Sequence, residues 1–164
     1  MVYRESFKLH SNHKMSTFHN VTQQTREIVA RSGIKDGIVV VYSRHTTCCV
    51  ITEEDAFDMS MTGLTTLQQD LVEAFETFLP QYRKEGMYLH PGPKALEFAE
   101  KHGEDARGCH NTDAHLRSSI IGRSETVLLI EGELDLGQFG HIFFIDFDQT
   151  RGRERTVQIQ IVGE

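Results

Sequence analysis

The chain has no hydrophobic run long enough to cross a membrane, which requires about 20 consecutive apolar residues. Its N-terminal stretch, MVYRESFKLHSNHKMSTF, also lacks the continuous apolar segment of a secretory signal. We therefore expect a cytoplasmic protein without a membrane partner.

Cysteine is scarce, and three cysteines cannot form a disulfide framework. Cys48 and Cys49 are adjacent, so on a strand they would face opposite sides and could not easily chelate one ion together. We expect reduced, small, buried residues, as is usual in a cytosolic protein. Metal ligation by one of them is the alternative.

Positive charge is in deficit, since 17 Lys and Arg stand against 24 Asp and Glu and the net charge is −7. This balance argues against general affinity for nucleic acid, although a local basic cluster could still bind a small anion. No internal repeat or biased tract is present. The 164 residues, 38% hydrophobic and 25% charged, are typical of one globular domain spanning residues 1–164.

The residues of greatest chemical interest follow a strand pattern at residues 39–54. Apolar, β-branched residues on both sides of a polar run predict one strand through this stretch. Alternation would place His45 on the same face as Ser43 and Thr47. The purely structural interpretation is a half-buried strand whose His and Thr side chains form hydrogen bonds with neighbouring groups.

The rest of the chain predicts an α+β protein. Residues 81–111 show no periodic spacing of apolar residues and contain Pro91 and Pro93. Such a long irregular segment is typical of a lid or binding loop. The clean alternation of residues 156–162 predicts a strand with one face on the core and the other wet or paired with a second subunit. The expected strands are 3–9, 126–130, 141–147 and 156–162, and the expected helices are 17–31, 64–79, 94–102 and 113–122.

Familiar metal motifs are absent, because the sequence contains no HExxH and no CxxC pair. Histidines from distant segments can nevertheless supply three ligands and leave one position open. Our preferred set is His45 from the strand, His90 from the loop and His115 from the short helix.

An anion site is the second candidate. Guanidinium groups and hydroxyls together suit phosphate, and Arg151 and Arg153 could combine with Ser43, Thr46 and Thr47. The alternative is a surface arginine cluster paired with nearby acids, namely Asp146, Asp148 and Glu154. The acidic run Glu53, Glu54 and Asp55 could supply a general base or a ligand, or simply cap the next segment.

Several motifs in order resemble the YjbQ family, also named UPF0047. The resemblance covers nearly the whole chain. It departs from the family at Gln138, Phe139 and Gly140, where a hydroxyl residue and Trp-Gln are usual, and in a longer connection after His90. The matching motifs are Ser43-x-His45-Thr46-Thr47, an acid eight or nine residues later, Asp70-Leu71 followed by Pro80, Tyr88-x-His90, Asn111-x-Asp113-Ala114-His115-Leu116, Ser124-x-x-Val127-x-Leu129-x-x-Gly132-x-x-x-x-Gly137 with Gly122 before it, and Asp148-x-x-Arg151-x-Arg153.

The resemblance implies a compact α+β subunit, a mixed or antiparallel β-sheet sandwich with a few packing helices, that associates as a homotrimer. It also implies a metal and anion pocket at a subunit boundary. Its activity would be a secondary thiamine-phosphate synthase reaction, which joins hydroxymethylpyrimidine diphosphate to thiazole phosphate.

Transferred residue by residue, the resemblance gives a divalent ion, zinc or magnesium, on His45, His90 and His115. Glu54 or Asp113 would orient a ligand or move a proton, while Arg151, Arg153 and Thr46 would receive phosphate. Two alternatives stay open: a metal-dependent hydrolase of a small phosphorylated metabolite, and a non-catalytic trimeric protein that binds metal or metabolite.

Overall fold

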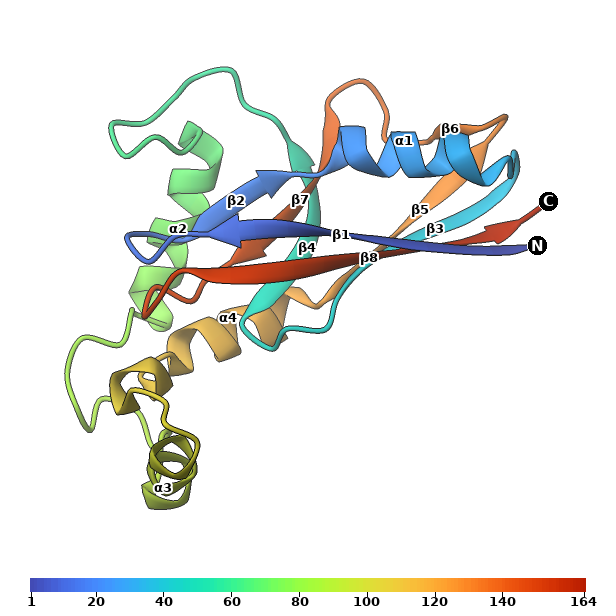
Figure 1. The fold of residues 1–164 in the computed structure, drawn as a ribbon. Helices are drawn as coiled ribbons and strands as arrows, with labels where there is room; N and C mark the ends of the chain where they lie inside the picture. The colour runs from blue at the N-terminus through green and yellow to red at the C-terminus, as the bar shows by residue number, and fades with distance from the viewer.

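The structure is a computed structural model that describes all residues from 1 to 164. It contains two antiparallel sheets and four α-helices, and the two termini lie side by side at one end (Figure 1). The elements are β1 (Val2–Ser11), β2 (Thr17–Asn20), α1 (Thr22–Ser32), β3 (Gly37–Ser43), β4 (Cys48–Glu54), α2 (Thr66–Phe78), α3 (Pro93–Lys101), the 3-10 helix η1 (Ala106–Cys109), α4 (Thr112–Ile121), β5 (Ser124–Ile130), β6 (Glu133–Leu134), β7 (Gly140–Asp146) and β8 (Arg153–Gly163).

All strand pairs are antiparallel. The larger sheet has the order β1-β8-β3-β5-β6 and the smaller one the order β2-β7-β4. In the larger sheet Val2 lies opposite Val162, and the β1–β8 pairing continues to Ser11 opposite Arg153. This long ribbon explains why the first and last strands are neighbours, and the structure confirms the expected α+β class with antiparallel sheets.

The main core lies between the two sheets and beneath α1. Its buried side chains include Val39 and Val41 of β3, Val157 of β8 and Phe144 of β7. Burying such side chains contributes roughly 1.5–3 kcal/mol each. A smaller core joins the other side of β7 to α2 and α4. No helix of the structure combines the length and hydropathy required to cross a membrane.

The prediction of one strand over residues 39–54 is wrong. The chain leaves the larger sheet at Ser43 and enters the smaller sheet at Cys48, so β3 and β4 belong to different sheets. A short turn between them therefore bridges the layers, and His45 and Thr47 are turn residues instead of members of one strand face.

The predicted helix over residues 17–31 also begins too early. Residues 17–20 form β2, which pairs with β7, and the helix starts at Thr22. The Oδ1 atom of Asn20 accepts a hydrogen bond from the Thr22 N–H at 3.1 Å. Gly33, in the left-handed region with φ of 70°, ends the helix as expected.

The remaining helices lie where the sequence predicts them. Thr65 and Gln68 form a capping box at the start of α2. Pro93 occupies the first turn of α3, as its fixed φ favours. In Figure 1, α3 stands away from the sheets at the end of the molecule opposite to the termini.

Candidate functional site

Residues 44–47 form a turn at the point where the chain crosses from one sheet to the other. The Ser43 Oγ accepts the His45 N–H at 3.2 Å, and the Cys48 N–H donates to the His45 carbonyl at 3.1 Å. These bonds fix the turn locally, in the manner of a serine turn. The turn therefore places Arg44, His45, Thr46 and Thr47 between the last residue of β3 and the first residue of β4.

Helix α4 packs against β4 and brings a second histidine to this turn. The Val50 N–H donates to the Gly122 carbonyl at 3.2 Å, which ties the end of α4 to the strand. His115, in the second turn of α4, lies beside the turn. The resulting cavity has a volume of about 280 Å³ and is lined by Arg44, His45, Thr46, Thr47, Asn111, His115, Arg153 and Arg155, which we call the anion cavity.

The anion cavity has neither an apolar nor an acidic lining residue. Three guanidinium groups and two imidazoles surround it, together with two hydroxyls and one amide. Such a lining offers mainly hydrogen-bond donors and positive charge, which is the chemistry that phosphate oxygens accept.

A buried ion pair shapes one wall of the anion cavity. The Arg155 Nε donates to Asp146 Oδ2 at 2.6 Å, and the Arg155 Nη2 donates to Thr47 Oγ1 at 2.9 Å. Arg155 is 4% exposed and Asp146 is fully buried. The charge of Arg155 is therefore neutralised within the protein, and its main effect is to hold the Thr47 side chain in place.

Arg153 is less completely paired. Its Nη2 lies 3.6 Å from Asp148 Oδ2, while its Nε is buried and has no hydrogen-bond partner. Burial lowers the pKa of Arg153, and the charge of Asp148 opposes that shift. A buried N–H without an acceptor costs free energy, so this group is a natural contact for an anion.

His45 is a neutral hydrogen-bond acceptor in this arrangement. The Thr156 N–H donates to His45 Nε2 at 2.9 Å, which places the imidazole proton on Nδ1. Burial and the positive charges of Arg155 and Arg44 lower the pKa of His45. One of its two nitrogens is therefore already occupied.

His90 and His115 form a second pair, with ring centroids 5.7 Å apart and the rings nearly perpendicular. Burial, and then the nearby His90, lowers the pKa of His115. The chain gathers no group of three His, Cys, Asp or Glu side chains that could hold a metal ion. Within one chain, His45, His90 and His115 therefore do not complete a three-ligand set.

Other predicted residues lie outside the anion cavity lining. Ser43 is buried beneath the turn. Arg151 pairs with Glu104 at 2.9 Å. Glu54 is exposed at the opposite end of β4, about 20 Å along a seven-residue strand. Asp113 is buried in a neighbouring cavity, and burial raises its pKa.

Three lining residues were not among the predicted site residues: Arg44, Asn111 and Arg155. Arg155 could have been found, because it is two residues from Arg153 and alternate residues of a strand share a face. Arg44 lies within the Ser-Arg-His-Thr-Thr run itself. Asn111 precedes α4 and its Nδ2 donates to Asp148 Oδ2 at 3.1 Å, a contact that sequence spacing does not reveal.

The adjacent cysteines take no part in the cavity. Cys48 belongs to the main core and Cys49 to the smaller core, so they face opposite sides of β4. Burial raises the pKa of both thiols, which disfavours the reactive thiolate. The two residues are small buried core residues, as the sequence predicts.

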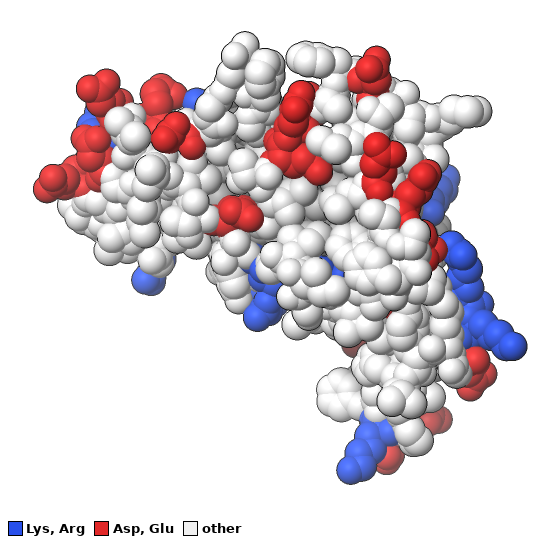
Figure 2. All heavy atoms as spheres, turned by 180° about the vertical axis from the view of Figure 1, so that it is seen from behind, with Lys and Arg blue, Asp and Glu red and all other residues white.

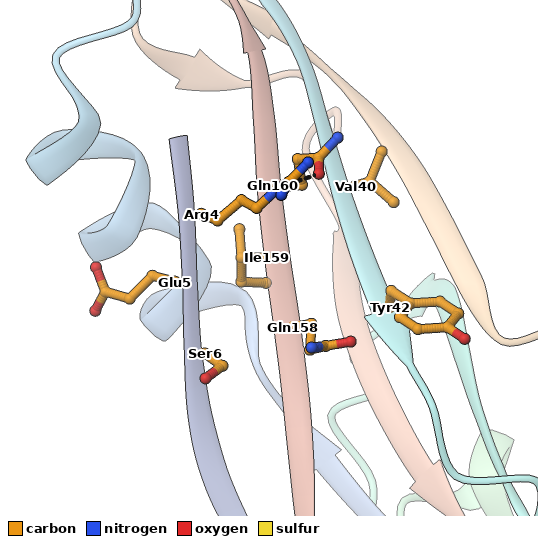
Figure 3. A pocket seen from close by; sticks show the side chains of 8 residues that line it. All are labelled: Arg4, Glu5, Ser6, Val40, Tyr42, Gln158, Ile159 and Gln160. Atoms are coloured by element: carbon orange, nitrogen blue, oxygen red, sulfur yellow. Dashed lines mark hydrogen bonds between the residues drawn. The ribbon is translucent and has the colours of Figure 1, made fainter. Parts of the chain in front are cut away.

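The outer face of the larger sheet carries a separate shallow hollow of about 510 Å³. Figure 3 shows the side chains that line it, which come from β1, β8 and β3, with Arg4 donating a hydrogen bond to Gln160. None of the predicted site residues lies there. Figure 2, the view from behind, shows acidic side chains mostly over the upper half of that face and a run of basic side chains along the right edge, where acidic side chains lie beside them.

The chain matches a known family over nearly its whole length. The family model described as "UPF0047 protein YjbQ-like" matches residues 5–164. A UPF0047 protein of Methanocaldococcus jannaschii is 31% identical over 145 residues, covering 88% of this chain and 84% of the relative. One of Methanothermobacter thermautotrophicus is 26% identical over 163 residues, covering 99% and 94%.

Solved structures give the same result for the fold. A hypothetical protein from Aeropyrum pernix K1 is 26% identical with a TM-score of 0.72, and the match covers 99% of both chains. A YjbQ/UPF0047 family structure from Clostridium acetobutylicum is 24% identical with a TM-score of 0.69, over 98% of this chain and 99% of that one. The chain therefore belongs to the YjbQ-like UPF0047 family.

Proposed function

We propose that the anion cavity binds the phosphate or diphosphate group of a small metabolite. The observation that carries the proposal is Arg153, which lines a cavity without acidic residues and whose buried Nε has no hydrogen-bond partner in the protein. A phosphate oxygen would supply the missing acceptor in a charge-assisted hydrogen bond.

Neighbouring groups support the same ligand. Thr46 is exposed at the turn and can donate its hydroxyl, and Arg44 adds an exposed guanidinium to the half-buried one of Arg153. Arg155 is bound to Asp146, so it contributes by orienting Thr47. The guanidinium groups of Arg44 and Arg153, together with the fixed Thr47, suit a ligand group with several oxygens.

Calorimetric titration with inorganic diphosphate tests this proposal. We expect wild-type protein to bind it and Arg153→Gln to bind about 10-fold to 100-fold more weakly, since a hydrogen bond to a charged group is worth about 1.5–3 kcal/mol. Arg26→Gln is the matched control, because Arg26 pairs with Glu133 on the surface, away from the cavity lining. Equal affinity in all three proteins would overturn the proposal.

For the reaction, we extend the proposal to the thiamine-phosphate synthase activity that the family resemblance implies. Departure of a diphosphate needs charge neutralisation more than covalent catalysis, and Arg44 and Arg153 would supply it. Hydroxymethylpyrimidine diphosphate and thiazole phosphate should give thiamine phosphate with wild type, and the rate should fall at least tenfold in Arg153→Gln. If wild type binds diphosphate but forms thiamine phosphate no faster than the same mixture without protein, the proposed synthase activity fails and only ligand binding stands.

A divalent ion belongs to the same set of proposals. His90 and His115 would supply two nitrogen ligands, and the remaining ligands would come from bound phosphate or from a second chain. Elemental analysis of tag-free protein tests this. Metal retained by wild type and lost in His115→Ala supports the ion, and absence of metal after incubation with zinc or magnesium and diphosphate contradicts it.

Homotrimer formation is the last proposal, and the outer face of the larger sheet supports it. Val2, Val162, Ile38 and Leu128 lie directly opposite one another across four strands. All four are exposed on the face away from the core, with exposed fractions between 37% and 60%. A contiguous apolar row of this kind is typical of a surface that pairs with another copy.

For the location of the protein, we propose the cytoplasm. All three cysteines are free, which suits a reducing compartment.

A further inference from the structure

The longest stretch of the chain without a positive charge runs from Arg44 to Arg83. Residues 45–82 contain seven Asp and Glu residues and no Lys or Arg. Of these seven acids only Glu76 forms an ion pair, with Arg83 at 2.8 Å and with Arg117 at 2.6 Å. The part of the surface that this stretch forms, around the end of β4 and along α2, therefore carries uncompensated negative charge.

The loop of residues 55–65, between β4 and α2, holds three large apolar side chains in solvent. Phe57 is 86% exposed, Met59 is 62% exposed and Met61 is fully exposed. Figure 1 shows this loop reaching away from the sheets before the chain returns to α2. Clustered exposure of large apolar side chains is typical of an interaction site, whereas a single exposed one needs no explanation.

Hydrogen bonds fix the loop in this open form. The Ser60 N–H donates to the Leu64 carbonyl at 2.7 Å, and the Thr66 N–H donates to the Asp58 carbonyl at 2.9 Å. The loop is thus tied to itself and to the first residue of α2. The exposure of its apolar side chains is a consequence of the fold.

The apolar surface continues along α2. Four apolar residues of the helix follow one another at intervals of three or four, so they share one side of it. Leu67 is 38% exposed and Phe78 is 59% exposed, so this side is only partly covered by the protein. We call the combined surface of loop and helix the docking surface, and its residues are Phe57, Met59, Met61, Leu67, Leu71, Ala74 and Phe78.

Carboxylates border the docking surface. Asp58 lies in the loop between Phe57 and Met59, and Asp70 lies on α2 next to Leu71, and both acids are exposed. Acidic side chains here disfavour an anionic membrane surface, which attracts Lys and Arg. A partner whose apolar side chains are flanked by Lys and Arg matches the docking surface both in hydrophobicity and in charge.

We propose that the docking surface binds a basic amphipathic helix of a partner protein. The apolar face of that helix would lie along α2 and against Met59 and Met61, and its Lys and Arg side chains would face Asp58 and Asp70. A helix held through apolar anchors on one face is a recurrent mode of recognition. Methionine suits it because a flexible thioether adapts to the shape of its partner. The docking surface shares no residue with the anion cavity, so the proposal is independent of phosphate binding.

A labelled synthetic peptide of leucine and lysine, with leucine on one face of the helix, tests the proposal by fluorescence anisotropy with the full chain. Wild type should bind the peptide. Met61→Ser and Phe78→Ser should each bind it about 10-fold more weakly, which corresponds to about 1.4 kcal/mol. Phe98→Ser is the matched control and should bind as wild type does, because it removes an equally exposed aromatic side chain from α3. The same peptide with glutamate in place of lysine should not bind.

Three results would overturn the proposal. The first is that wild type does not bind the lysine peptide, or binds the glutamate peptide equally well. The second is an equal affinity of wild type and Met61→Ser, a variant that should fold normally because Met61 is fully exposed. The third comes from light scattering, in which we expect wild type and Met61→Ser to have the same mass. A smaller mass for Met61→Ser would show that a second copy of the chain covers the docking surface.

Discussion

Arg155 and Asp146 form a bidentate ion pair inside the molecule, with Nε 2.6 Å from Oδ2 and Nη2 3.2 Å from Oδ1. Asp146 also accepts a hydrogen bond from Ser11 Oγ at 2.6 Å. The pair therefore joins β1, β7 and β8, and it holds Thr47 at the anion cavity through the other bond of Arg155.

Removing one member of this pair should destabilise the fold. We expect Asp146→Asn to lower the free energy of unfolding by about 3–5 kcal/mol, because the buried guanidinium loses its closest counter-charge and keeps only Asp148, at 3.8 Å. Urea denaturation followed by circular dichroism measures the loss. Asp135→Asn, at an exposed site, should change it by less than about 0.5 kcal/mol. A loss below about 1 kcal/mol in Asp146→Asn would show that the pair matters little.

His19 should make stability depend on pH. Burial lowers its pKa from the usual 6.5, the charge of Asp146 opposes the shift, and the buried Nε2 has no partner. Since the unfolded chain takes up the proton first, this contribution is complete above pH 6.5 and is lost as the pH falls towards the lower folded pKa.

Thermal melting at pH 7.5 and pH 5.5 tests the effect of His19. The melting temperature of wild type should fall on acidification, and His19→Gln should reduce that fall. His13→Gln, which alters an exposed loop histidine, is the control. An identical fall in wild type and His19→Gln would assign the acid sensitivity to other groups.

The exposed apolar row on the larger sheet should govern self-association. Ile38→Asp and Leu128→Lys each place a charge in the row, and both should shift the mass measured by light scattering from trimer towards monomer. Thr126→Lys, two residues from Leu128 on the same face but in the next row, tests how far the contact extends. A monomeric wild type at all concentrations would contradict the proposed surface.

Local sequence patterns predict most of the strands and helices, because the spacing of apolar residues identifies the type of element and capping or turn residues mark its ends. The capping box at Thr65 and the left-handed glycine after Ser32 are signals of this kind. Two predictions, the single strand over residues 39–54 and the helix starting at residue 17, are wrong because pairing with distant strands determines the structure there. Residues 17–20 form a strand only because β7 lies beside them, and no local period shows that partner.

The candidate site was predicted in part for the same reason. His45, Thr46 and Thr47 occur together in the sequence, and His115 and Arg153 follow from the family motifs. The contact of Asn111 with Asp148 depends on loops that are remote in sequence. The separation of Glu54 from His45 follows from the extended course of β4, and the predicted continuous strand would already have kept these two residues far apart.

A crystal structure of the protein soaked with inorganic diphosphate would show directly whether the anion cavity binds phosphate groups. We expect diphosphate density in the anion cavity, with an oxygen about 2.8 Å from Arg153 Nε and a second contact to Thr46 or Arg44. An empty anion cavity at saturating diphosphate, or diphosphate bound only elsewhere with Arg153 Nε still unpaired, would contradict it.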